Sequence, residues 1–186
     1  MQAPGQPCPL AWTAVVPQDH FAAWKPRVQQ IYLAELTAVP LMLARHANLF
    51  RGEDALFFVD NEGALAALVR GGSGEADAEA VAHIVHSLAT ILNCRIWWDW
   101  VDSASNPTDC MSRVGLAADP VRTGTWSGEL FTNFPFWSEK GCPWKTAQAL
   151  LDYNWEEVIA HEETYMEHLA APAESRSFSS SPAASC

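Results

Sequence analysis

The sequence predicts an α/β domain in which a central sheet is flanked by helices. Residues 55–59 form a continuous apolar run of strand length, and residues 62–69, with helical spacing, follow directly. A second helical pattern leads into the aromatic and β-branched run at 95–101. Alternating strands and helices are typical of an α/β layer. The 186 residues, 49% of them hydrophobic and 18% charged, fit one globular domain with tails.

The N-terminal part is predicted to contain a strand pair and a long helix. Residues 1–9 hold three Pro and one Gly and form a disordered lead-in. Residues 10–16 are short and apolar, and a turn separates them from residues 21–24, which suggests a strand pair. The helical pattern of residues 28–47 covers more than one face, so this helix is largely buried. Pro40 interrupts it, and we expect a kink or restart there.

The middle of the chain is predicted to continue as strand, helix, helix and strand. Ala55–Val59 is a central strand, because a continuous apolar run is typical of a strand buried on both faces. A helix at residues 62–69 follows this strand, and the Gly-rich segment 70–74 ends that helix. Residues 76–92 form the second helix, and residues 95–101 form a strand because they are rich in aromatic and β-branched residues.

The C-terminal part is predicted to be an appendage and a tail. Asn106-Pro107 begins a short helix that runs through Met111. Pro, Gly and Trp dominate beyond Gly115 until a helical pattern at 146–169, and the Ser-rich end has too few apolar residues to order itself. The predicted divisions are a disordered lead-in at 1–9, a domain at 10–114, a Trp-rich appendage with a C-terminal helix at 115–170 and a disordered tail at 171–186.

Composition restricts the classes of function. The formal net charge of -11 opposes binding to a phosphate backbone, since non-specific nucleic-acid affinity comes largely from Lys and Arg. No apolar stretch is long enough to span a membrane, so we expect an intracellular protein, nuclear or cytoplasmic, without a membrane partner. The five cysteines contain no C-x-x-C pair, which argues against a zinc ribbon or a disulfide framework.

Three carboxylates occupy positions that this organisation would bring together. Glu35 lies within the first helix among apolar neighbours, Asp60 follows the central strand, and Asp109 lies in the last short helix. Sites in open α/β sheets gather at the carboxyl ends of strands. A buried carboxylate is costly without a cation or hydrogen-bond partner, so Glu35 favours a metal site.

The segments around these acids resemble a known superfamily. They read IYLAELTA at 31–38, FFVDNEGAL at 57–65 and NPTDCMSR at 106–113. In order and local setting they resemble the ribonuclease H-like superfamily, especially the reverse-transcriptase-associated domains of retrotransposons. The resemblance covers residues 10–114, a little over half of the chain.

The resemblance implies a mixed five-stranded sheet flanked by helices and a site that hydrolyses the RNA strand of an RNA/DNA hybrid. Glu35, Asp60 and Asp109 would be both the catalytic residues and the ligands of two magnesium or manganese ions, which suit hard oxygen ligands. The nucleic-acid contacts would come from Asn61, Asn106 and Arg113.

One element of that superfamily is missing from this sequence. The superfamily carries an aspartate on its first strand that bridges both metals, whereas residues 10–16 here resemble its second strand. We therefore expect an N-terminally truncated domain with weak or no nuclease activity. An upstream polymerase domain or a protein partner would fill the gap in the sheet. A separate hypothesis is that the chain is a fragment of a longer protein that contains the polymerase and first-strand sequence.

Other interpretations stay open. Asp60-Asn61 after a strand is also typical of a turn or helix cap. His83 and His86 lie three residues apart on a helix, but with no third ligand nearby in sequence they favour packing over a metal site. Trp97, Trp98 and Trp100 could stack bases, although core and sheet-face packing is the commoner role. The alternative function is a non-catalytic protein-interaction module on a remnant ribonuclease H-like fold, which would explain the acidic charge.

Overall fold

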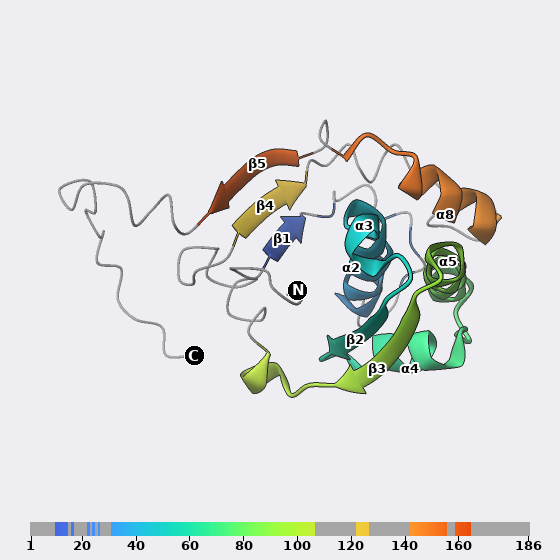
Figure 1. Ribbon diagram of the computed structural model, residues 1–186. Helices are drawn as coiled ribbons and strands as arrows, with labels where there is room; N and C mark the ends of the chain where they lie inside the picture. Colours follow the sequence, from blue (N-terminus) through green and yellow to red (C-terminus); the bar gives the residue numbers. More distant parts are fainter. Residues whose placement is uncertain are drawn as a thin grey trace, which may run out of the picture.

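The computed structural model describes residues 10–14, 16, 22, 24, 26, 31–106, 122–126, 142–155 and 159–164 (Figure 1). These residues form a mixed α/β structure in which helices pack on a small parallel sheet. The elements in chain order are β1 (Leu10–Ala14), α2 (Ile31–Arg45), α3 (Ala47–Phe50), β2 (Asp54–Val59), α4 (Glu62–Arg70), α5 (Ala76–Leu92), β3 (Arg95–Trp100), the 3-10 turn η1 (Ser103–Ser105), β4 (Arg122–Trp126), α8 (Pro143–Leu151) and β5 (Ile159–Thr164).

The strands β2 and β3 form a two-stranded parallel sheet. Their register pairs Asp54 with Arg95 at one end and Val59 with Trp100 at the other. Because the strands are parallel, the chain crosses back between them through α4 and α5, as parallel pairing requires. This confirms the predicted order of strand, helix, helix and strand.

The core lies among the helices and under one face of this sheet. α5 packs against α2 and α8, and α4 contacts α2, α5 and both strands. Large aliphatic side chains at helical spacing are fully buried there, and aromatic side chains of the sheet pack against them. The largest fully buried side chains are Leu33, Leu36, Leu41, Leu43, Leu68, Ile84, Leu88, Leu92 and Leu150.

The breaks between these elements have local causes. Gly71 adopts φ 67° at the end of α4, where its N–H reaches the carbonyl of Leu68, and this left-handed conformation favours glycine. The predicted Gly-rich breaker is therefore confirmed. Asn93 has the same role at the end of α5, with φ 51°. The turn it makes leads directly into β3.

The helix α2 runs through Pro40 without a break. We predicted a kink or restart at this residue; the helix does not restart there but continues to Arg45, and the break falls at His46. Pro40 is itself buried, together with Val39 and Leu41. Tertiary packing of this face thus maintains the helix despite the hydrogen bond that proline cannot donate.

The described strands lie in two sheets, whereas the resemblance implies a single five-stranded one. β1 pairs in parallel with β4, and β4 pairs antiparallel with β5. Of the expected strand at residues 21–24, the structure describes Ala22, which is helical, and Trp24, which lies in a bend and is buried. A local hairpin was predicted for β1, but its partner comes from far along the chain.

The expected helix at 146–169 is also shorter than predicted. α8 ends at Leu151, and Ile159–Thr164 is a strand. Turn-forming Asp152 and Asn154 separate the two elements. Ala147 and Leu150 of α8 belong to the same core as the other helices, and Trp155 donates its indole N–H to the carbonyl of Leu150 at 2.9 Å.

Several expectations lie outside the described residues. They concern the lead-in at 1–9, the short helix from Pro107 to Met111, most of the Trp-rich segment and the tail at 171–186.

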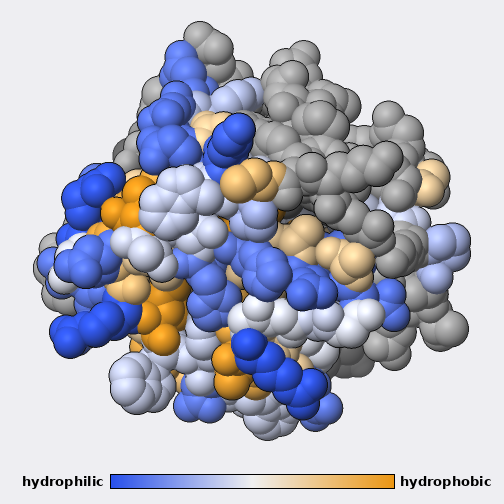
Figure 2. Space-filling view, turned by 90° about the vertical axis from the view of Figure 1, so that its right-hand side faces the viewer, coloured by the Kyte–Doolittle hydropathy of each residue, from blue (hydrophilic) through white to orange (hydrophobic). Residues whose placement is uncertain are grey.

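Figure 2 faces the side of the molecule on which α5 and α8 lie, and hydrophobic and hydrophilic side chains alternate over it. Within the described part of the chain, every helix is too short or too polar to cross a membrane.

Candidate functional site

The carboxyl end of β2 holds two of the predicted site residues. Asp60 directly follows Val59, the last residue of the strand, and is half-buried. Asn61 caps α4, because its Oδ1 accepts hydrogen bonds from the backbone N–H groups of Gly63 at 3.0 Å and Ala64 at 3.1 Å. The sequence offered two roles for Asn61, a nucleic-acid contact and a helix cap. In the structure its side-chain oxygen caps α4.

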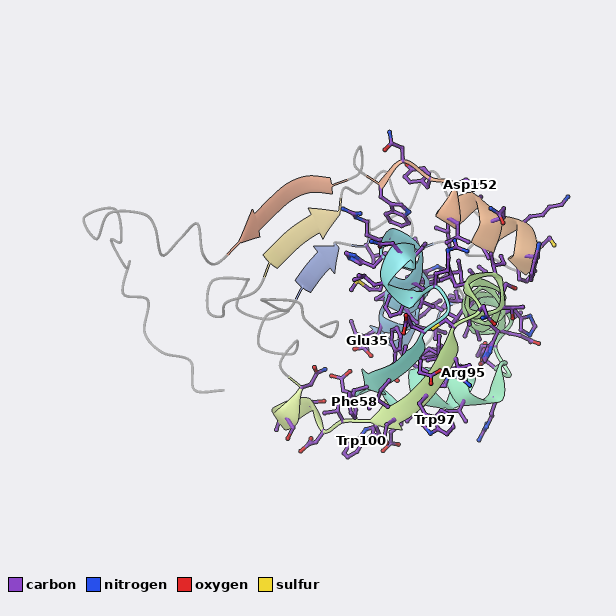
Figure 3. All side chains as sticks on the ribbon, in the orientation of Figure 1. Glu35, Phe58, Arg95, Trp97, Trp100 and Asp152 are labelled. Atoms are coloured by element: carbon purple, nitrogen blue, oxygen red, sulfur yellow. The ribbon has the colours of Figure 1, made fainter. Side chains whose placement is uncertain are left out.

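Glu35 lies on α2, which contacts α4. The side chain is half-buried, and its Oε2 atom is enclosed. Tyr32, one helical turn earlier, lies against the first turn of α4, since a Cβ added at Gly63 would be 3.7 Å from Cδ2 of Tyr32. Residues three apart share a helix face, so Glu35 lies on the face of α2 that approaches α4. In the view of Figure 3, Glu35 lies between α2 and β2.

The third predicted carboxylate cannot be placed relative to these two. Asp109 and Arg113 lie outside the described residues. Asn106 ends the turn that follows β3, where its N–H donates to the carbonyl of Ser103 at 3.2 Å. Because β2 and β3 are parallel neighbours, the segment from Val101 starts at the same end of the sheet as Asp60, where both strands finish.

The donor chemistry of Glu35 and Asp60 suits a hard cation. Glu35 and Asp60 offer carboxylate oxygens, which magnesium and manganese prefer over zinc. Among the residues that the structure describes, no three His, Cys, Asp or Glu side chains are grouped closely enough to hold a metal ion. Two of the three expected ligands therefore fit the expected metal by donor type, and a complete ligand set would need a further group.

The two histidines of α5 have other surroundings. Nε2 of His86 lies 2.8 Å from the carbonyl oxygen of Leu68, which ties α5 to the end of α4. Nε2 of His83 lies 3.8 Å from Glu79 on the same helix, and both side chains are about half exposed. Packing and surface contacts therefore account for both residues, as the sequence favoured.

Cys94 lies buried at the start of β3. Burial raises the pKa of its thiol, and the nearby Asp54 and Glu53 carboxylates act in the same direction. A raised pKa keeps the thiol protonated and poorly nucleophilic near neutral pH. Cys94 therefore has the properties of a structural cysteine.

The three tryptophans of β3 fall into two groups. Trp98 points inward and packs against Phe57 in a tilted arrangement, with ring centroids 5.2 Å apart, as the packing interpretation requires. Trp97 is 74% exposed and Trp100 is 49% exposed. Sequence reasoning favoured packing for all three, with base stacking as the alternative, and did not distinguish the two exposed residues from Trp98. The alternation of residues along β3 was the signal that places Trp97 and Trp98 on opposite faces.

Comparison of the chain with known protein families, with curated proteins and with solved structures yields no match.

Proposed function

We propose that this chain is a ribonuclease H-like domain of a retroelement reverse transcriptase, with impaired two-metal nuclease activity toward RNA/DNA hybrids. The observation that carries the proposal is the position of Asp60 directly after a parallel strand. Glu35 lies on α2, and α2 contacts α4, the helix that follows Asp60. The resembling segment 57–65 spans the end of β2 and the start of α4.

The roles of the residues follow from their positions. Glu35, Asp60 and Asp109 would hold magnesium or manganese, which when bound supplies an activated water and stabilises the leaving oxygen. Glu35 contributes a half-buried carboxylate from a helix that packs in the core, and Asp60 contributes one at the start of the strand-to-helix turn that Asn61 caps. Asn61 fixes that turn through its cap. Asn106 and Arg113 would contact the nucleic acid.

The expectation of impaired activity rests on the first-strand aspartate that the resemblance implies and this sequence lacks. β3 is the one strand that pairs with β2 in the described part of the chain, and β1 lies in the other sheet. The edge on which a first strand with a bridging aspartate would pair therefore has no described partner. An upstream polymerase domain or a protein partner could supply that strand.

The metal site is tested by the thermal stability of the chain with and without magnesium or manganese. A ligand that binds only the folded state raises the melting temperature. We expect a rise in the original chain that Asp60→Asn and Glu35→Gln each abolish. The matched control Asp152→Asn removes an exposed carboxylate at the end of α8 and should keep the rise. A rise that persists in Asp60→Asn, or no rise at all, would reject the site.

Nuclease activity needs a second measurement on an RNA/DNA hybrid. We expect slow or no cleavage in the presence of magnesium. Fast cleavage that Asp60→Asn abolishes would keep the metal site and overturn the expected impairment. Cleavage that survives in Asp60→Asn would show that another group, or a contaminant, carries the activity.

The second candidate function is a non-catalytic protein-interaction module on the same fold. It is favoured by the exposed apolar face of the β2–β3 sheet and by the net charge of -11. A chain that shows no metal-dependent stabilisation and no cleavage would rank this function first.

A further inference from the structure

The β2–β3 sheet has one face packed and one face open. The open face, called here the outer face, consists of three cross-strand pairs in register: Asp54 with Arg95, Leu56 with Trp97, and Phe58 with Asp99. All six side chains are exposed. In Figure 3, Phe58 and Trp97 lie along the two strands on the side away from α2 and α5.

Exposure of this kind is unusual for parallel strands. Parallel sheets are normally covered on both faces, because crossover helices pack on each side. Here Leu56 is 57%, Phe58 58% and Trp97 74% exposed, and the three side chains are neighbours. A contiguous exposed apolar patch on a folded domain commonly marks a binding surface. Tryptophan is also among the residues that contribute most to binding energy.

The charges around the outer face restrict what it can bind. Glu53, Asp99 and Asp102 are exposed acids at or beside it. The basic side chain on this face, Arg95, is neutralised by Asp54, since its Nε and Nη2 donate to the two carboxylate oxygens at 2.6 and 2.9 Å. The face is therefore apolar in the middle and negative at its rim.

This charge pattern opposes two classes of partner. A nucleic acid would bring its phosphates next to these exposed carboxylates. A second copy of the chain would bring the same acids against themselves, in a protein whose net charge is already -11. A basic polypeptide with apolar side chains has complementary chemistry.

We propose that the outer face of the β2–β3 sheet binds a basic polypeptide segment. The apolar side chains of the bound segment pack on Leu56, Phe58 and Trp97, and its Lys or Arg side chains form ion pairs with Asp99 and Asp102. This surface does not include Glu35 or Asp60, so the proposal is independent of the proposed metal site.

The test is a titration of the full chain with three fluorescently labelled probes. The first is a synthetic peptide of alternating Leu and Lys, the second is the same peptide with Glu in place of Lys, and the third is oligothymidylate. We expect the Lys peptide to bind and the other two probes to bind much more weakly. We expect Trp97→Ala to weaken binding of the Lys peptide by about tenfold or more, and Asp99→Asn to weaken it by a smaller factor that shrinks as salt is added.

Matched variants separate this surface from general attraction to an acidic protein. Trp144→Ala removes a tryptophan that is 51% exposed on α8, and Asp152→Asn removes an exposed acid there. Both should leave the affinity unchanged. If they weaken binding as much as Trp97→Ala and Asp99→Asn do, the proposal fails. Leu56→Ala on the same face should act in the direction of Trp97→Ala and serves in its place if that variant does not fold.

Other occupants would overturn the proposal in recognisable ways. Tighter binding of oligothymidylate that Trp97→Ala abolishes would assign the face to nucleic acid. Concentration-dependent dimerisation that Trp97→Ala abolishes would assign it to a second copy. The metal test gives a separate answer, because we expect Asp60→Asn to keep the affinity for the Lys peptide and Trp97→Ala to keep the stabilisation by magnesium.

Discussion

The two faces of the β2–β3 sheet use similar residues for different purposes. On the inner face, Phe57 lies between Phe50 and Trp98, with ring centroids 5.7 and 5.2 Å away. On the outer face, Phe58 and Trp97 are exposed although each is the direct sequence neighbour of an inner residue. The comparison teaches that residue type alone does not assign a role to an aromatic side chain in a strand. Its role depends on whether helices cover the face to which it points.

The largest expected difference between the two faces is in stability. Trp98→Ala should lower the free energy of unfolding by about 3 kcal/mol, because it removes a large side chain that packs on the core. Trp97→Ala should change it by less than about 0.5 kcal/mol. Urea unfolding followed by circular dichroism measures both. Equal losses would show that the outer face is also covered in solution.

The next effect concerns the helix that holds the inner face. Asn61 caps α4, which contacts both strands, so Asn61→Ala should destabilise the protein by about 1 kcal/mol. Asn61→Asp keeps an oxygen that accepts from the same N–H groups and should restore most of the loss. If both variants were equally destabilised in the same unfolding measurement, the cap would not be the stabilising contact.

A smaller effect is expected from the ion pair on the outer face. Asp54 and Arg95 form a short two-pronged contact, but their side chains are 68% and 79% exposed. Solvent screening limits the value of exposed pairs, so a double-mutant cycle of Asp54→Asn and Arg95→Gln should give a coupling energy of about 0.5 kcal/mol that falls with salt. A coupling of several kcal/mol would contradict the exposure of this face.

The smallest effect is a pH dependence from Cys94, the buried cysteine next to the inner face. Burial, followed by the charges of Asp54 and Glu53, raises the pKa of this thiol above its ordinary value of 9.0. The folded state then holds the proton more tightly than the unfolded state. The resulting stabilisation is complete below about pH 9 and is lost as the pH rises through the raised pKa.

Unfolding free energies measured across this range should therefore fall more steeply for the original chain than for Cys94→Ala. The matched variant Cys142→Ala removes an exposed thiol and should keep the slope of the original chain. Identical slopes in all three proteins would show that the environment of Cys94 does not favour its protonated form.

The sequence predicted the elements that depend on local patterns and missed those that depend on distant contacts. The helix at Ala76–Leu92 was predicted with the observed bounds, because its apolar spacing and the flanking turn residues are local signals. The continuity of α2 through Pro40 depends on packing against α5 and α8, and the partner of β1 is β4. No local pattern reveals either contact.

The candidate site shows the same division. The apolar run of β2 was enough to place Asp60 at the carboxyl end of a strand. The position of Glu35 relative to Asp60 depends on how α2 packs on α4, which the sequence does not specify. The alternation along β2 and β3 indicates which side chains share a face, but not that the outer face is left open.

The crossover between β2 and β3 has a consequence for folding. Asp54 and Arg95 are 41 residues apart in the chain, so the two strands can pair only after α4 and α5 have brought their ends together. We therefore expect the helices to form early and the sheet to assemble late. Leu56 and Phe58 of one strand and Trp97 of the other become neighbours only in that last step. A partner that needs all three side chains would thus distinguish the finished fold from any earlier state of the chain.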